Sequence, residues 1–225
     1  MINRIYFSFA LGFISLALPV NPASAFVTDG QGASIFDLSG ASKSKKDSKA
    51  IALYKQAIDF LAKNDLVQAQ STFEQSLKKD PRYVNSILGL AEVYFRQKQV
   101  DKAGEILREA LTRISNDDDL YLAWGRYLYL GKKFTESESA FKKAIEINPL
   151  SVRARLDLGD LYLNALNKKS EAIKIYRDVI ALNPNHAGAH YALGIALYDG
   201  HEPAEVVAQL QEANRLEPNN PLPLN

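Results

Sequence analysis

The sequence predicts an all-α fold built from about five stacked helix pairs. Three observations support this. Prolines at positions 81, 149, 184 and 218 are separated by 68, 35 and 34 residues, so a period close to 34 residues runs through the chain. The same order of small and large apolar residues precedes each proline, and no segment alternates convincingly between apolar and polar residues in the manner of a β-strand.

The residues before each proline predict the second helix of each pair. In the first unit a small residue, a large apolar residue and another small residue stand at spacings of four and three, which places them on one face of a helix. The proline follows the helix and sets the turn into the next unit. The repeated sets are Ala69, Phe73, Ser76 and Pro81; Ser137, Phe141, Ala144 and Pro149; Ala172, Tyr176, Val179 and Pro184; and Val206, Leu210, Ala213 and Pro218; the second unit has Ala103, Leu107 and Ala110 with Ser115 in place of proline.

A second pattern, upstream in each unit, predicts the first helix. A large residue is followed at once by a small one and, three residues later, by another large one. The small residue lies where the axes of the two helices cross, because close packing needs a minimal side chain there. The sets are Leu90-Ala91 with Tyr94, Trp124-Gly125 with Leu128, Leu158-Gly159 with Tyr162 and Leu193-Gly194 with Leu197; the first unit has the poorer match Gln56-Ala57 with Phe60.

These five copies in register resemble the tetratricopeptide repeat family, and the resemblance covers residues 50 to about 220. It implies a right-handed α-solenoid whose first helices line a concave groove. The large apolar residue near the start of the first helix (Leu53, Ile87 and Tyr121) becomes Arg155 and His190 in the last two units. The fourth unit has one extra residue, which we place near Asn167. The predicted organisation is a signal peptide over 1–25, a flexible linker over 26–49, repeats over 50–83, 84–117, 118–151, 152–186 and 187–220, and a proline-rich tail over 221–225.

The first 25 residues predict export. Arg4 is followed by an uncharged apolar run from Ile5 to Leu18, and Ala23-Ser24-Ala25 offers the small residues that a signal peptidase accepts. We expect cleavage after Ala25, with an uncleaved anchor as the alternative, and no membrane span in the mature chain. The periplasm is the expected compartment, with a secreted or signal-anchored protein as alternatives.

The following segment is rich in Gly, Ser, Asp and Lys and has no helical period, which predicts a linker. Ile35, Phe36 and Leu38 form an apolar island within it. A docking motif is one interpretation of this island, but we favour an apolar stretch of linker without a function.

The composition argues against most kinds of catalytic or metal site. The chain of 225 residues has no cysteine, three histidines and a formal net charge of +1, so neither thiol chemistry nor nucleic-acid binding is expected. His186 and His190 have the spacing of a metal site, but one lies in a turn and the other at a packing position. The acidic run from Asn116 to Asp119 is better explained as a helix cap than as a calcium site. We expect no catalytic residue, no metal and no cofactor.

The predicted function is that of a non-catalytic scaffold or adaptor that binds a peptide or helix of another protein in its concave groove and helps to assemble a complex in the cell envelope. The alternative is a self-assembling scaffold, a homo-oligomer joined through an uncapped last repeat. Some relatives hold a partner's terminal carboxylate with Lys and Asn at set groove positions. The corresponding positions here hold Leu88 and Glu92, Leu122 and Arg126, and Leu156 and Asp160, so an apolar ligand fits better.

The resemblance also assigns the groove residues. Leucine recurs at one groove position as Leu88, Leu122 and Leu156. We favour an exposed apolar stripe that binds the partner; the alternative is that these leucines pack against the first helix of the next unit. The candidate binding residues are Asn85, Leu88, Glu92, Phe95, Arg96, Leu122, Arg126, Tyr129, Arg153, Leu156, Asp160, Leu163, Tyr191, Ile195 and Tyr198.

Overall fold

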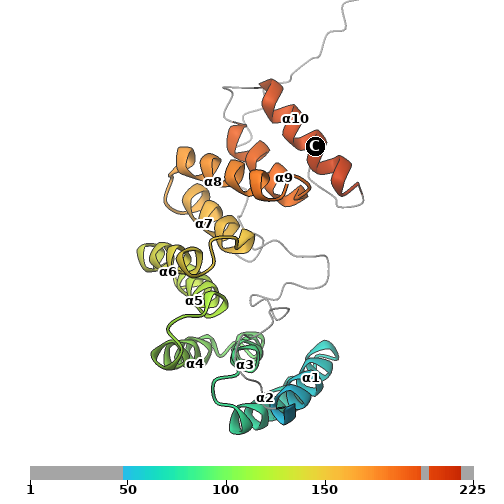
Figure 1. The fold of residues 1–225 in the computed structure, drawn as a ribbon, viewed down its shortest axis with the longest axis vertical. Helices are drawn as coiled ribbons and strands as arrows, with labels where there is room; N and C mark the ends of the chain where they lie inside the picture. Colours follow the sequence, from blue (N-terminus) through green and yellow to red (C-terminus); the bar gives the residue numbers. More distant parts are fainter. Residues whose placement is uncertain (1–47, 199–202, 219–225) are drawn as a thin grey trace, which may run out of the picture.

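The structure, a computed structural model, describes residues 48–198 and 203–218. Within these ranges the chain forms ten α-helices and no strand, as the periodicity predicts (Figure 1). Each helix has 11 to 15 residues. Their bounds are α1 (Ser48–Ala62), α2 (Leu66–Lys79), α3 (Val84–Arg96), α4 (Val100–Arg113), α5 (Asp118–Leu130), α6 (Phe134–Ile147), α7 (Val152–Asn164), α8 (Lys169–Leu182), α9 (Ala187–Leu197) and α10 (Pro203–Leu216).

The helices pack as consecutive pairs that follow a curve. Each helix lies against its neighbours in the chain, and each odd-numbered helix also touches the next odd-numbered one. The even-numbered helices do not touch each other, so the stack is tighter on its odd-numbered side. The odd-numbered helices therefore form the inner side of the curve from α3 to α9, and α4, α6 and α8 form the outer side (Figure 1).

The two helices of a pair approach closely where the sequence places a small residue. A Cβ atom added to Gly125 in α5 would lie 2.5 Å from the Phe141 ring of α6, well inside van der Waals contact. Phe141 itself is fully buried, so the ring has no room to withdraw. The fourth and fifth pairs have the same arrangement, with Gly159 against Tyr176 and Gly194 against Leu210.

The turn inside each of the first four pairs has one residue with positive φ. These residues are not glycines, although the left-handed region carries a cost for any residue with a Cβ atom. The turn between α7 and α8 has four residues, 165–168, where the preceding pairs have three, so the extra residue of the fourth unit lies in this turn. The four residues with positive φ are Asn64, Lys98, Lys132 and Asn167, with φ of 57°, 62°, 57° and 52°.

The turns between pairs end one helix and cap the next. Asp80, Asn148 and Asn183 end their helices in extended or near-extended conformations before proline. Asp117 accepts a hydrogen bond from the Leu120 amide at 3.0 Å, so the acidic run from Asn116 to Asp119 begins α5 as a cap. Asp65, Ser151 and His186 cap α2, α7 and α9 in the same way.

The boundaries differ slightly from those expected. The first helix begins at Ser48, so the last two residues of the predicted linker belong to the solenoid. The predicted signal peptide, the rest of the linker and the proline-rich tail lie outside the described residues. None of the described helices is both long enough and apolar enough to cross a membrane.

We expect Gly125→Ala to destabilise the fold. The new methyl group would overlap the Phe141 ring, and overpacking of this kind costs about 1–3 kcal/mol, more than the roughly 1 kcal/mol that alanine gains over glycine in a helix. Thermal unfolding followed by circular dichroism measures the effect.

Gly131→Ala is the matched control. Gly131 has φ of −76° at the end of the same helix, and an added Cβ would meet its nearest atom at an ordinary 3.5 Å. Its midpoint temperature should stay the same or rise. Equal losses in both variants would mean that the close approach of α5 and α6 is not what requires a glycine.

Candidate functional site

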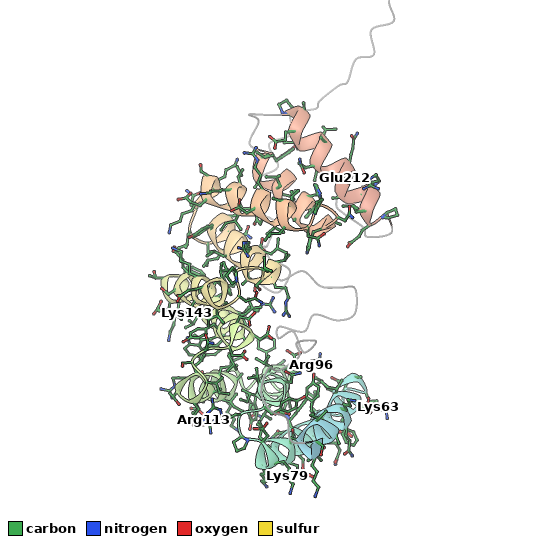
Figure 2. The ribbon with its side chains drawn as sticks, viewed as in Figure 1. Lys63, Lys79, Arg96, Arg113, Lys143 and Glu212 are labelled. Atoms are coloured by element: carbon green, nitrogen blue, oxygen red, sulfur yellow. The ribbon has the colours of Figure 1, made fainter. Side chains whose placement is uncertain are left out.

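The predicted groove residues all lie on or next to the odd-numbered helices. Four helices, α3, α5, α7 and α9, supply them, and Tyr198 directly follows α9. Figure 2 shows Arg96 of α3 on the inner side of the curve, whereas Arg113 and Lys143 point to the outer side. We call the surface formed by these residues the inner face. Whether it binds a partner stays a prediction, but its geometry is now defined.

The leucine stripe is buried, and the expectation that it is exposed is wrong. Leu88, Leu122 and Leu156 are 3%, 3% and 7% exposed. Leu122 and Leu156 belong to one hydrophobic cluster. Because successive odd-numbered helices touch, a side chain at this position is held between them. Packing against the neighbouring unit, the alternative interpretation, describes these leucines correctly.

Charged side chains connect α5 to α7 across the inner face. Arg126 Nε donates to Asp157 Oδ2 at 2.5 Å and its Nη2 donates to Oδ1 at 3.3 Å, with both side chains largely excluded from solvent. In a second pair the arginine is on α7 and the acid on α5: Arg153 Nη2 donates to Asp119 Oδ1 at 2.9 Å. One forked and one single guanidinium contact between neighbouring units fix the angle between them more strictly than apolar contact alone.

Asp157 was missed by the sequence analysis. A signal for it was present, because the equivalent positions in units two, three and five hold Gly89, Ala123 and Ala192. An acid among small residues in a packed helix needs a cation close by. Burial raises the pKa of Asp157, and the Arg126 guanidinium opposes that rise.

A second carboxyl group, Asp160, lies next to this pair. Tyr176 of α8 reaches through from the outer layer and donates its hydroxyl hydrogen to Asp160 Oδ1 at 2.7 Å. Burial raises the pKa of Asp160 to about 7, and the nearby Asp157 charge adds to the rise, whereas the Tyr176 hydrogen bond and Arg126 lower it. The inner face at α7 therefore has a carboxyl group that titrates near neutral pH.

The inner face has a covered part and an open part. The covered half comprises Asn85, Leu88 and Glu92 of α3 with Leu122, Arg126 and Tyr129 of α5, all of them buried. Phe95 and Arg96 at the end of α3 are half-buried, as are Arg153, Asp160 and Leu163 of α7, and Leu156 is buried.

The open half comprises Tyr191, Ile195 and Tyr198 in the last unit. Tyr191 is half-buried, Ile195 is 44% exposed and Tyr198 is 75% exposed. These three residues are the part of the predicted groove that presents large apolar side chains to solvent. The leucines of the stripe, Leu88, Leu122 and Leu156, are buried instead, so the open half is the candidate binding surface.

The two histidines within the described residues, His186 and His190, take structural roles. His186 Nδ1 accepts from the Ala189 amide at 3.1 Å as the cap of α9. His190 lies between Gln209 Oε1 at 2.6 Å and the Pro184 carbonyl at 2.9 Å. Within residues 48–198 and 203–218, no three acidic or histidine side chains are placed to share a metal ion.

We expect Leu122→Glu to unfold or strongly destabilise the chain. The nearby Arg126 is already paired with Asp157, and a buried carboxylate without a cation of its own costs several kcal/mol. Tyr198→Glu, at another inner-face position but exposed, should change the unfolding free energy by less than about 0.5 kcal/mol. Urea denaturation measures both. A Leu122→Glu variant of wild-type stability would show that the leucine stripe faces solvent after all.

The Asp160 carboxyl should make stability depend on pH. Its pKa is higher in the folded than in the unfolded chain, so the folded state binds the proton more tightly, and stability falls as pH rises from about 4 to about 7. Each pKa unit corresponds to about 1.4 kcal/mol, and we expect at least about 1 kcal/mol of loss between pH 5 and pH 8.

Asp160→Asn removes the titration but keeps an oxygen that accepts the Tyr176 hydrogen bond. Denaturation of wild type and variant at pH 5 and pH 8 should show a smaller loss in the variant. An identical loss in both proteins would place the Asp160 pKa near that of an ordinary carboxyl group.

Models of the tetratricopeptide repeat match this chain over residues 60–123, 122–178 and 165–221. Among curated proteins, the human tetratricopeptide repeat protein 7A is 27% identical over 135 residues, which are 60% of this chain but 16% of that protein. The chain thus spans less than a fifth of this relative.

Solved structures show the same fold. PilF of Pseudomonas aeruginosa superimposes with a TM-score of 0.68 at 21% identity, covering 75% of this chain and 77% of that one. YrrB, described as a repeat protein with an unusual peptide-binding site, gives a TM-score of 0.56 at 22% identity over 76% of this chain and 88% of its own. With the repeat models matching from residue 60 to residue 221, the chain belongs to the tetratricopeptide repeat family, whose members are scaffolds that bind peptide or protein partners.

Proposed function

We propose that the open half of the inner face binds a peptide or helix of a partner protein through apolar side chains, without catalysis. The observation that carries the proposal is the exposure of Ile195 and Tyr198 on a face whose other candidate residues are buried or half-buried. Tyrosines and an aliphatic residue on a rigid helix lose little conformational freedom on binding and bury a large area, which is typical of the residues that dominate interface energies.

The neighbouring surface supports an apolar ligand with polar edges. Leu163 and the exposed Asn164 at the end of α7 lie one unit away, and α7 touches α9. YrrB, a protein of the same fold, is described as having a peptide-binding site, which supports peptide binding as a use of this architecture. An extended or helical segment lying across α7 and α9 is the ligand that this surface fits.

We place this binding in the cell envelope. The support is the predicted signal peptide over residues 1–25, since a chain exported in this way would meet its partner outside the cytoplasm. The proposed role is that of an adaptor in the assembly of an envelope complex, with the periplasm as the compartment.

Self-assembly is the second candidate. Val207 of α10, 52% exposed, adds to the apolar surface of the last unit, and a second copy of the chain would bury it. A native mass that rises with protein concentration, without any other bound protein, would favour this candidate.

Crosslinking capture from an envelope extract of the source organism tests the proposal, with the double variant Ile195→Ser and Tyr198→Ser beside the wild type. Because both side chains are largely outside the core, the variant should fold normally but lose most of the captured partner. Two truncated hot-spot residues of about 2 kcal/mol each would lower affinity by a factor of several hundred or more.

The matched control is the double variant Val67→Ser and Leu150→Ser. These residues are 71% and 73% exposed but lie at the start of α2 and in the turn before α7. The control should capture the partner as the wild type does. Equal capture by all three proteins would exclude the open half as the binding surface.

A further inference from the structure

Helix α3 is covered on every side over most of its length. Ten consecutive residues, Val84 to Val93, are all buried. Helix α7 occupies the equivalent place in its unit, with helices of its own pair and of both neighbouring units against it, just as α3 has α1, α2, α4 and α5. Yet Val152, Arg155 and Asp160 of α7 are partly exposed. The two helices thus have equivalent neighbouring helices, yet part of α7 is exposed to solvent and no residue from Val84 to Val93 of α3 is.

The excess burial falls on the inner face. Glu92 of α3 is fully buried, although the equivalent positions in α7 and α9 hold the partly exposed Asp160 and Ile195. Its carboxylate accepts a hydrogen bond from Arg96 Nε at 2.6 Å, and that arginine is itself only 31% exposed. Asn85, about two helical turns earlier on the same face of α3, is buried as well. Polar groups at these positions of an open groove would be in contact with water.

The chain enters the described fold beside the first turn of α3. Ser76 Oγ donates to the carbonyl of Ala50 in the first turn of α1 at 2.8 Å and lies 2.7 Å from Ser86 Oγ in the first turn of α3. The residues that precede Ser48 therefore begin next to α3. A segment of residues 26–47 reaches about 70 Å when extended, and α3 is only about 20 Å long.

We propose that residues 26–47 dock in cis along the covered half of the inner face. Ile35, Phe36 and Leu38 supply the apolar side chains of this segment, and the rings of Phe95 and Tyr129 supply those of the inner face at α3 and α5. Asp37, inside the apolar island, matches the arginines of the surface, Arg96 and Arg126. The predicted linker is then an internal ligand.

The consequence for binding is that an outside partner meets an inner face already filled at α3 and α5. It has free access to the last unit and extends further only by displacing the segment. Because the segment is tethered, its effective concentration is in the millimolar range, enough to hold a short apolar motif of low intrinsic affinity and to release it to a stronger ligand. This inference concerns the chain alone and does not depend on the proposed partner.

Thiol labelling tests it, since the natural chain has no cysteine. In the full chain, Asn85→Cys places a single thiol on the covered half, and its rate of reaction with a maleimide is measured. The triple variant Ile35→Ser, Phe36→Ser and Leu38→Ser should raise that rate at least about tenfold. Tyr198→Cys is the control, because its thiol lies on the open half and should react equally fast in both backgrounds. An unchanged rate at Asn85→Cys in two folded proteins would overturn the proposal.

Disulfide trapping gives an independent answer. The pair Phe36→Cys and Phe95→Cys should form a disulfide within one chain on oxidation, and the pair Phe36→Cys and Val67→Cys should not, because Val67 lies on α2 and is exposed. Disulfides formed only between chains would identify a second copy as the occupant and overturn docking in cis. Equal trapping by both pairs would also overturn it. None of these results depends on partner capture by Ile195 and Tyr198, so failure here and failure of the proposed function are separate.

Discussion

The close approach of two helices at a small residue is the constraint on which the rest of the structure depends. Gly125 admits the Phe141 ring, and Gly159 admits that of Tyr176. This contact sets the distance between the helices of a pair. It also brings the first helix near enough to its neighbours for successive odd-numbered helices to touch, and that contact creates an inner face. With a larger residue at the crossing, the pairs would splay and the inner face would lose its geometry.

Charged side chains add directional contacts to the packing between neighbouring units. The Arg126 and Asp157 pair lies between units three and four, where Leu122 and Leu156 belong to one hydrophobic cluster. Buried ion pairs of this kind contribute little net stability compared with apolar residues of the same size, but they tolerate only one arrangement. The Tyr176 hydroxyl, which reaches Asp160 from the outer layer, extends this arrangement to a third helix, α8. The middle of the solenoid is therefore held in one register by directional contacts.

The fold could be predicted almost entirely from the sequence, because it follows from a repeated local pattern. The helix pairs, the small residues at their crossings and the acidic cap at Asp117 all came from spacing. The site could not be predicted to the same depth. Spacing assigns Leu88, Leu122 and Leu156 to a face, but whether a face is open depends on how closely the next helix approaches, which no single unit encodes. Asp157 was missed for a related reason, since its partner Arg126 is 31 residues away.

The restriction of contacts to neighbouring units has a consequence for how the chain acquires its structure. No helix touches one more than two places away among the described elements. Low sequence separation between contacting residues is associated with fast folding, since little loop-closure entropy is lost before contacts form. A chain delivered from its N-terminal end can complete the first pair before the last has emerged, and each later pair finds its template already in place. The helix pairs then fold in order from the N-terminal end, each against the pair before it.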